Sequence, residues 1–274
     1  MTPQPVPSRH ESVKQRRARL CESDVANHLL GTSFHPGGLK LTERLGTLLH
    51  LTPKSRVLDV ASGQGARSIF LAKRFKCFVA GLDYSSQNVA QATELAGANG
   101  LASRVRFYCG DAEHLPFLDA SFDAVICECA FCTFPNKSNT TGEFARVLRT
   151  RGRIGLSDFT RGEMLPQELD YLSALIPRVA DARPIAGYVE YLRSANFDME
   201  KVEFHNAALT ELVRQVRSKL LRAKDLVALK KLTLPGADFT SIKQMAQGVL
   251  AAVQEGHLDY VILVAFKSSF WYRG

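Results

Sequence analysis

The 274-residue sequence contains no apolar run that approaches the ~20 residues needed to cross a bilayer. Its first residues also lack the apolar stretch and small-residue cleavage site of a secretory signal, and carry a basic cluster, Lys14 to Arg19, instead. These absences predict a cytoplasmic protein with no membrane span. Residues 1–20 are expected to form a flexible basic arm, and residues 21–274 to form one large domain.

Cysteine is absent from the second half of the chain, since no cysteine follows Cys132. This distribution does not resemble the disulfide framework of a small secreted protein. Three cysteines, Cys127, Cys129 and Cys132, fall within six residues. A fourth ligand for a zinc site is not evident, so no metal is predicted. Each thiol can equally be a small buried hydrophobic group.

The chain has a formal net charge of +8 and a pI near 9.3, which permits attraction to nucleic acids and other anions. The basic residues are nevertheless spread out, with local concentrations at 14–19 and 214–231. The simpler interpretation is a basic tail and a solvated helix face. RNA binding through these two stretches is the alternative from a different functional class.

Short apolar strands alternate with amphipathic helices over about 100 residues, which predicts a parallel sheet covered on both faces by helices. Strands are predicted at 56–60, 78–82, 105–109, 124–127, 153–157, 199–205 and 260–266. Helices are predicted at 39–51, 66–75, 87–99, 141–148, 165–180, 185–195, 210–231 and 239–255. The expected fold class is α/β, a Rossmann-like, mostly parallel sheet of seven strands with a helical insert at about 207–256.

The first predicted strand ends in the sequence D-V-A-S-G-Q-G, Asp59 to Gly65, which leads into a helix. Such a turn lets the backbone approach a ligand, and the carboxyl ends of strands are where open α/β sheets bind ligands. Position 68 is serine, so the dinucleotide fingerprint G-x-G-x-x-G is incomplete, and the Gly-Lys-Ser/Thr of a phosphate-binding loop is absent.

The turn resembles motif I of the class I S-adenosylmethionine (SAM)-dependent methyltransferases, with Ala61 where that family usually has glycine. Asp83-Tyr84, Asp111-Ala112 and Phe122 to Cys127 match later family segments in order, and Arg146 to Ile154 matches the turn before strand five. The resemblance implies SAM as the cofactor, with Asp83 at the ribose hydroxyls and Asp111 at the adenine amino group. The implied cofactor-binding residues are Asp59, Ala61, Gly63, Gly65, Asp83, Tyr84, Asp111, Ala112 and Cys127. We expect Asp83→Ala to weaken SAM binding and to leave the fold intact.

The segment from Cys127 to Lys137 follows the fourth predicted strand, the acceptor end of the pocket in that family. It lacks the Asn/Asp-Pro-Pro-aromatic motif of nucleic-acid amino methyltransferases and the Pro-Cys nucleophile of cytosine C5 enzymes. On this resemblance a nucleic-acid partner is not expected, and a small-molecule substrate is. The segment resembles arsenite methyltransferases and also ubiquinone/menaquinone-type C-methyltransferases. The first likeness implies that Cys129 holds a soft acceptor, although further thiols of the arsenic family are missing after Cys132.

The predicted function is methyl transfer to a small molecule, with arsenite or a thiol held near Cys129 as the more specific hypothesis. The alternative is C- or O-methylation of a quinone-like or natural-product acceptor, which would need help with deprotonation. The predicted catalytic residues are Cys129, Glu128 and His114. The predicted substrate residues are His35, Cys129, Cys132 and Phe134. The sequence leaves the oligomeric state open.

Overall fold

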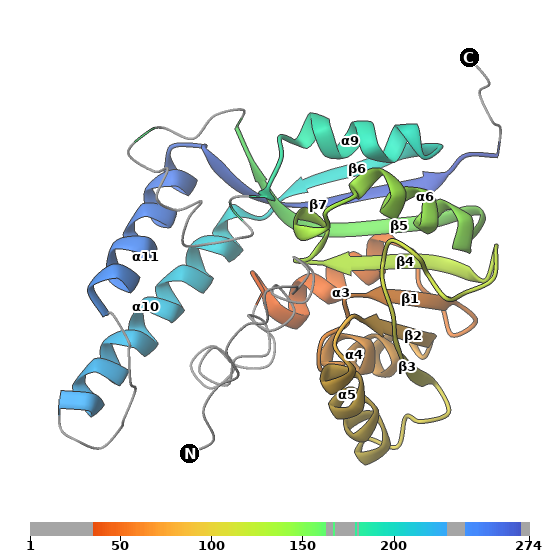
Figure 1. The fold of residues 1–274 in the computed structure, drawn as a ribbon, viewed down its shortest axis with the longest axis horizontal. Coiled ribbons are helices and arrows are strands. Elements are labelled where there is room, and N and C mark those ends of the chain that lie inside the picture. Colours follow the sequence, from red (N-terminus) through yellow and green to blue (C-terminus); the bar gives the residue numbers. More distant parts are fainter. Residues whose placement is uncertain (1–34, 163–166, 168–178, 180, 229–238, 270–274) are drawn as a thin grey trace, which may run out of the picture.

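A computed structural model describes residues 35–162, 167, 179, 181–228 and 239–269 (Figure 1). One seven-stranded sheet has the order β3-β2-β1-β4-β5-β7-β6. The strands are β1 (Arg56–Val60), β2 (Phe78–Asp83), β3 (Val105–Cys109), β4 (Phe122–Glu128), β5 (Leu148–Arg161), β6 (Phe197–Phe204) and β7 (Leu258–Lys267). Strand β7 is antiparallel to β5 and β6, and the other neighbouring pairs are parallel. The predicted seven-stranded, mostly parallel sheet is confirmed.

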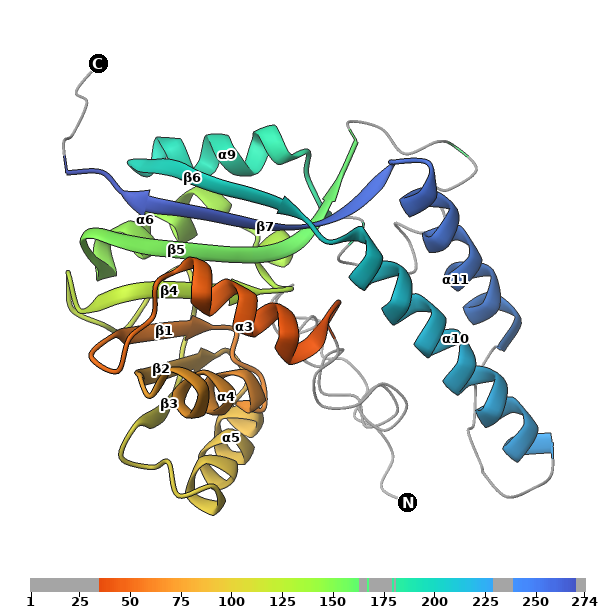
Figure 2. The same cartoon turned by 180° about the vertical axis from the view of Figure 1, so that it is seen from behind.

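Helices lie on both faces of this sheet, as predicted (Figures 1 and 2). The described helices are α3 (Gly38–Leu48), α4 (Ala66–Phe75), α5 (Ser86–Ala98), the short 3-10 helix η1 (Phe131–Thr133), α6 (Lys137–Val147), α9 (Ile185–Ser194), α10 (Asn206–Ala228) and α11 (Phe239–Gln254). Helices α3, α4 and α5 cover one face, and α6 and α9 cover the other. The predicted helix at 165–180 falls outside the described residues except for 167 and 179, and the arm at 1–20 lies outside them entirely.

The start of α6 differs from the sequence prediction of 141 because Asn136 caps the helix earlier. The Asn136 side chain accepts a hydrogen bond from the backbone N–H of Asn139 at 2.9 Å, which satisfies a donor that the first helical turn leaves free. The helix therefore begins at Lys137. Lys137, the last residue of the predicted acceptor segment, and residues 138–140 therefore belong to α6.

Strand β5 is also longer than predicted, because it is paired on both sides. It pairs with β4 from Leu148 onward and with β7 over Arg153 to Arg161. The turn that the sequence predicts before the fifth strand lies inside β5 as an irregularity. Arg151 has a φ of 62° there, and the register between β5 and β4 shifts. Neighbouring strands thus decide a length that local sequence does not show.

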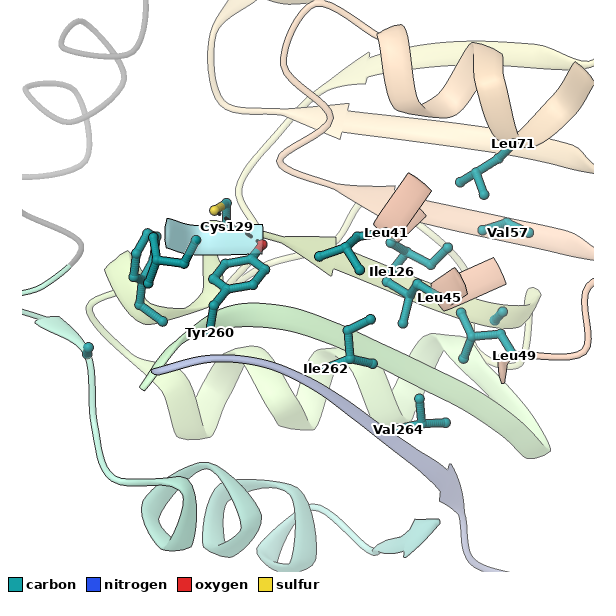
Figure 3. Packing of buried hydrophobic residues seen from close by; sticks show 14 of the residues in the cluster. Leu41, Leu45, Leu49, Val57, Leu71, Ile126, Cys129, Tyr260, Ile262 and Val264 are labelled. Atoms are coloured by element: carbon teal, nitrogen blue, oxygen red, sulfur yellow. Dashed lines mark hydrogen bonds between the residues drawn. The ribbon is translucent and has the colours of Figure 1, made fainter. Parts of the chain in front are cut away.

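The sheet separates two hydrophobic cores. The first core lies under α3 and α4, where Leu41 and Leu45 of α3, with Leu49 just after it, meet Ile126 of β4 and Ile262 of β7 (Figure 3). The second core lies under α6 and α9. Its largest fully buried members include Phe131, Phe144, Tyr188 and Phe197. Both cores flank the central strands and hold the carboxyl ends of these strands in place.

Helices α10 and α11 run side by side between β6 and β7 and extend away from the sheet (Figures 1 and 2). Leu209 and Val213 of α10, with Val249 and Ala252 of α11, join the first core. The base of this helical pair therefore adds an apolar wall beside the sheet. Among the residues that the structure describes, no helix is long and apolar enough to cross a membrane.

Candidate active site

The turn after β1 is built on the buried carboxylate of Asp59. Ser68 Oγ donates to Asp59 Oδ2 at 2.6 Å, and Arg67 Nη2 lies 3.8 Å from Asp59 Oδ1. Burial raises the pKa of Asp59 to about 6, and the charge of Arg67 opposes this rise. Arg67 also donates to the backbone oxygens of Ala61 at 2.7 Å and Glu128 at 3.2 Å. One arginine thus joins the ends of β1 and β4.

Three residues of this turn, Ala61, Gly63 and Gly65, have left-handed backbone conformations. Ala61 has a φ of 57°, and its carbonyl is held by Arg67, which explains how alanine replaces the usual glycine. A Cβ on Gly65 would lie 2.6 Å from Phe107 Cζ, so this glycine is required by packing. A Cβ on Gly63 would have no atom within 4 Å, so Gly63 borders open space.

Asp83 ends β2 and fixes the same turn from the neighbouring strand. Its Oδ2 accepts from the backbone N–H of Gly63 at 2.8 Å. Its Oδ1 accepts from the backbone N–H of Ser85 and from Asn88 Nδ2, both at 3.0 Å. Removal of this carboxylate therefore takes away three hydrogen bonds as well as a candidate ribose contact. We accordingly expect Asp83→Ala to lower the free energy of unfolding as well as SAM affinity. The next residue, Tyr84, has an exposed side chain.

The turn after β3 joins the cofactor and acceptor sides. Asp111 Oδ1 accepts from the backbone N–H of Glu113 at 3.0 Å, and Ala112 is buried beside it. The buried Glu113 side chain accepts from the backbone N–H of Asn136 at 2.9 Å, at the start of α6. The sequence prediction missed Glu113, whose only signal is its place next to Asp111-Ala112. His114 follows in this turn with an exposed side chain.

The residues at this edge fit SAM, which carries a cationic amino group and a ribose. Asp59 Oδ1 and Ser62 Oγ are buried polar atoms with no hydrogen-bond partner among the described residues. Unpartnered buried polar atoms are costly unless a ligand or water satisfies them. Together with the open space at Gly63, they form a polar cradle at the carboxyl ends of β1 and β2.

Glu128 closes β4 and is only 1% exposed. Ser157 Oγ of β5 donates to Glu128 Oε2 at 3.2 Å, and His35 Nδ1 lies 3.8 Å from the same oxygen. Burial raises the pKa of Glu128, while the charge of Arg67 and the nearby hydroxyl groups of Thr42 and Ser157 oppose this rise. The carboxylate is therefore more basic than an exposed glutamate.

Cys129 follows with a φ of 57°, and its backbone N–H donates to the Ser157 carbonyl at 2.7 Å. Its Sγ lies 3.4 Å from the hydroxyl of Tyr260 on β7, a contact drawn in Figure 3. The sequence prediction missed Tyr260. Its only signal is a phenol at the start of the apolar run 260–266, and a phenol needs a hydrogen-bond partner once buried.

The three clustered cysteines do not gather at one site. Cys127 and Cys132 pack in the second core with Phe131, whereas Cys129 packs in the first core. The left-handed turn at Cys129 directs it away from the face that Cys127 occupies. No group of three His, Cys, Asp or Glu side chains in the described parts of the chain is placed to hold a metal ion.

Of the predicted catalytic and substrate residues, the structure therefore brings together His35, Glu128 and Cys129. Phe134 packs against Phe131 with ring centroids 6.1 Å apart, on the side of the second core. Burial raises the pKa of Cys127 well above its usual range, as expected of a core thiol.

Comparison with known proteins identifies this architecture. Residues 51–183 match a family model described as a methyltransferase domain. The chain is 26% identical to 27-O-demethylrifamycin SV methyltransferase of Amycolatopsis mediterranei, over 89% of this chain and 93% of that protein. It is 42% identical to demethylmenaquinone methyltransferase of Deinococcus radiodurans over 38% of this chain and 43% of that protein.

The fold also matches a solved structure with bound cofactor. Phosphoethanolamine N-methyltransferase 2 of Haemonchus contortus, in complex with SAM, has a TM-score of 0.80 at 19% identity, over 97% of this chain and 62% of that one. The sheet order, the motif I turn and these likenesses agree. The chain is a class I SAM-dependent methyltransferase.

Proposed function

We propose that the protein transfers the methyl group of SAM to a hydroxyl or activated carbon of a small, largely apolar molecule. The observation that carries this proposal is the buried Glu128 at the end of β4, hydrogen-bonded by Ser157 and 3.8 Å from His35. A basic carboxylate beside the motif I turn suits an acceptor that must lose a proton. Relatives named for a demethylrifamycin and for demethylmenaquinone support an acceptor of this kind.

SAM supplies an electrophilic methyl group whose transfer depends mainly on alignment of donor and acceptor. The chain contributes the position and the base. Glu128 takes the proton of the acceptor, and its raised pKa suits that task. His35 Nδ1 lies 3.8 Å from Glu128 Oε2, so a protonated His35 would interact with the charge of this carboxylate. We assign no direct role to His114 in this step, because its side chain is exposed in the turn after β3.

The apolar wall is supplied by the base of the helical pair. Leu209 and Val213 of α10 and Val249 of α11 belong to the same core cluster as Cys129 and Tyr260. Apolar surroundings of this kind suit an acceptor that has an apolar body and one polar group.

For the cofactor, Asp59, Gly63 and Asp83 border the amino-acid and ribose parts, and Asp111 and Ala112 border the adenine. The support is the polar cradle around Gly63 and the match to the family segments. Ala61, Gly65 and Tyr84 complete this set, whereas the Cys127 side chain supports it only from the core.

A soft acceptor, arsenite or a thiol, is the second candidate. The specific observation in its favour is the Cys129 thiol beside Glu128 at the acceptor end. Because Cys127 and Cys132 pack in the other core, Cys129 would have to bind such an acceptor without them.

The test is label transfer from methyl-tritiated SAM to quinols, hydroxylated polyketides, arsenite with glutathione, simple thiols and total tRNA. We expect transfer to a quinol or hydroxylated polyketide, and a loss of about 100-fold or more in rate for Glu128→Gln. Transfer to arsenite or a thiol that Cys129→Ser abolishes would favour the second candidate instead.

The cofactor assignment has a readout that does not depend on the acceptor. Calorimetry should show that Asp83→Asn weakens SAM binding by about tenfold or more, since a neutral amide replaces a carboxylate that accepts hydrogen bonds from hydroxyls. Asp83→Asn keeps one oxygen for the structural contacts that Asp83→Ala loses. Unchanged SAM affinity in a folded Asp83→Asn protein would remove Asp83 from the cofactor site.

A further inference from the structure

Four buried polar groups form a continuous chain across strands β4, β5 and β7. Cys129 Sγ lies 3.4 Å from Tyr260 Oη, Tyr260 Oη lies 3.2 Å from Ser157 Oγ, and Ser157 Oγ donates to Glu128 Oε2 at 3.2 Å. All four residues are less than 9% exposed. The base of the helical pair and the α3 leucines lie in the same core, so the chain runs through a largely apolar region.

Proton counting gives this chain a direction. An ionised Glu128 only accepts, so the single proton of Ser157 goes to Glu128. Ser157 Oγ can then only accept from Tyr260, and the Tyr260 oxygen is left to accept from the Cys129 thiol. When Glu128 is protonated instead, all three hydrogen bonds can reverse and point toward a Cys129 thiolate.

We propose that Tyr260 and Ser157 form a proton relay through which Cys129 and Glu128 share one proton. In the transfer, the S–H bond of Cys129 breaks and its proton passes to the Tyr260 oxygen, the Tyr260 proton passes to Ser157, and the Ser157 proton passes to Glu128. No net charge or proton is gained or lost. Tyr260 and Ser157 are positioning residues in this assignment, because they act through the two groups at the ends.

The surroundings favour an anion at either end of the chain. Arg67 of α4 is close enough to interact with the charges of both Glu128 and Cys129. Among the described residues, Asp59 of β1, Cys127 of β4 and His35, which precedes α3, also interact with the Glu128 end of the relay. Burial raises the pKa of Tyr260 well above its usual range, so its hydroxyl stays neutral and can both donate and accept.

The consequence is that Cys129 becomes a thiolate at the acceptor end when its proton moves to Glu128. A thiolate there can take the proton of a hydroxylated acceptor or contact a soft one. This role in methyl transfer rests on the proposed function, whereas the proton sharing is a property of the protein alone.

The experiment measures the thiolate of Cys129 directly, in the full chain, by its ultraviolet absorbance from about pH 5 to pH 9. The difference between wild type and Cys129→Ser isolates this one thiol from the other cysteines. We expect a thiolate transition in wild type. In Tyr260→Phe its midpoint should move upward by about one to two pH units, because the thiolate loses a hydrogen-bond donor. For each variant, the matching double substitution with Cys129→Ser supplies the baseline.

Tyr188→Phe is the matched control. Tyr188 is also buried and loses the same hydroxyl, but its hydroxyl donates to the Phe159 carbonyl at 2.9 Å and lies outside the chain of four groups. In Tyr188→Phe the midpoint of the Cys129 thiolate transition should equal that of wild type. Ser157→Ala interrupts the relay in the middle and should shift the midpoint like Tyr260→Phe, which keeps a test available if one variant does not fold.

An unchanged midpoint in folded Tyr260→Phe or Ser157→Ala would overturn the relay, as would a wild type without a thiolate transition in this range. The measurement needs no methyl acceptor. Failure of the relay is therefore distinguishable from failure of label transfer.

Discussion

Gly63 and Gly65 share a left-handed backbone, with φ values of 55° and 84°, but they differ in what surrounds them. A Cβ on Gly65 would meet Phe107 and Ala92 at 2.6 and 2.8 Å, whereas one on Gly63 meets nothing within 4 Å. We expect Gly65→Ala to lower the free energy of unfolding by about 2–4 kcal/mol, from overpacking plus backbone strain. Gly63→Ala should lower it by only about 1–2 kcal/mol, from backbone strain alone.

Urea unfolding of both variants checks this difference, and each serves as the control for the other. If the space at Gly63 belongs to the cofactor, Gly63→Ala should weaken SAM binding more than Gly65→Ala does. Equal losses of stability would mean that Phe107 moves aside without cost and that packing is not what requires glycine at position 65.

Some single residues of the site can be identified from sequence, and others cannot. Asp59, Asp83 and Asp111 are found from sequence because each follows directly on a predicted strand, where a short motif is enough. Tyr260 is not found, because its partners Cys129 and Ser157 lie 131 and 103 residues away and meet it only through strand order and register. Proximity in sequence also misleads, since Cys127 and Cys129 pack in different cores.

At the scale of elements, α6 depends on a side-chain cap. Asn136 Oδ1 accepts from the backbone N–H of Asn139 at 2.9 Å, and the backbone N–H of Asn136 itself donates to Glu113 Oε1 at 2.9 Å. Asn136→Ala should lower the free energy of unfolding by about 1 kcal/mol, since a first-turn donor loses its partner.

Asn136→Ser is the conservative control, because serine caps helices about as well as asparagine and should restore nearly all the loss. Both variants keep the backbone N–H that donates to Glu113. Thermal unfolding monitored by circular dichroism measures the pair. If serine and alanine destabilise equally, the cap contributes nothing and another contact fixes the start of α6.

Element boundaries were predictable where local chemistry sets them. Strand β1, helix α4 and strand β3 have the predicted bounds, because glycine or polar turns flank clear apolar patterns. The residues of β5 beyond Ser157 were not predictable, since they are stabilised by pairing with β7, which is separated from β5 by α9, β6, α10 and α11. The length of such a strand depends on its neighbouring strands and cannot be predicted from its own sequence alone.

At the scale of the whole molecule, buried charge is concentrated at one edge of the sheet. Asp59, Glu128 and Arg67 lie at the carboxyl ends of β1 and β4, between two apolar cores. Burial raises the pKa values of both acids, so this edge opposes folding when the acids ionise. The ionised acids of the site therefore lower the stability of the whole fold. The protonation of these acids can be followed through the free energy of unfolding, without a substrate.

The pH dependence of unfolding should reveal this cost at Asp59. Its pKa is about 6 in the folded protein against 3.8 as the ordinary value, so the folded state holds the proton over a range in which the unfolded state has lost it. The stability contributed by protonated Asp59 is complete below the lower value and declines as pH rises through the folded pKa. Between about pH 4.5 and pH 7.5 this group alone should lower the free energy of unfolding by about 2 kcal/mol.

Asp59→Asn removes that dependence and leaves the other titrating groups in place. Its stability relative to wild type should therefore rise by about 2 kcal/mol from about pH 4.5 to pH 7.5, whatever the offset between the two proteins at the lower pH. Urea unfolding at both pH values, without SAM, gives this difference directly. A relative stability that is flat with pH would mean that Arg67 fully compensates the ionised carboxylate, and Asp59 would then be an ordinary structural ion pair.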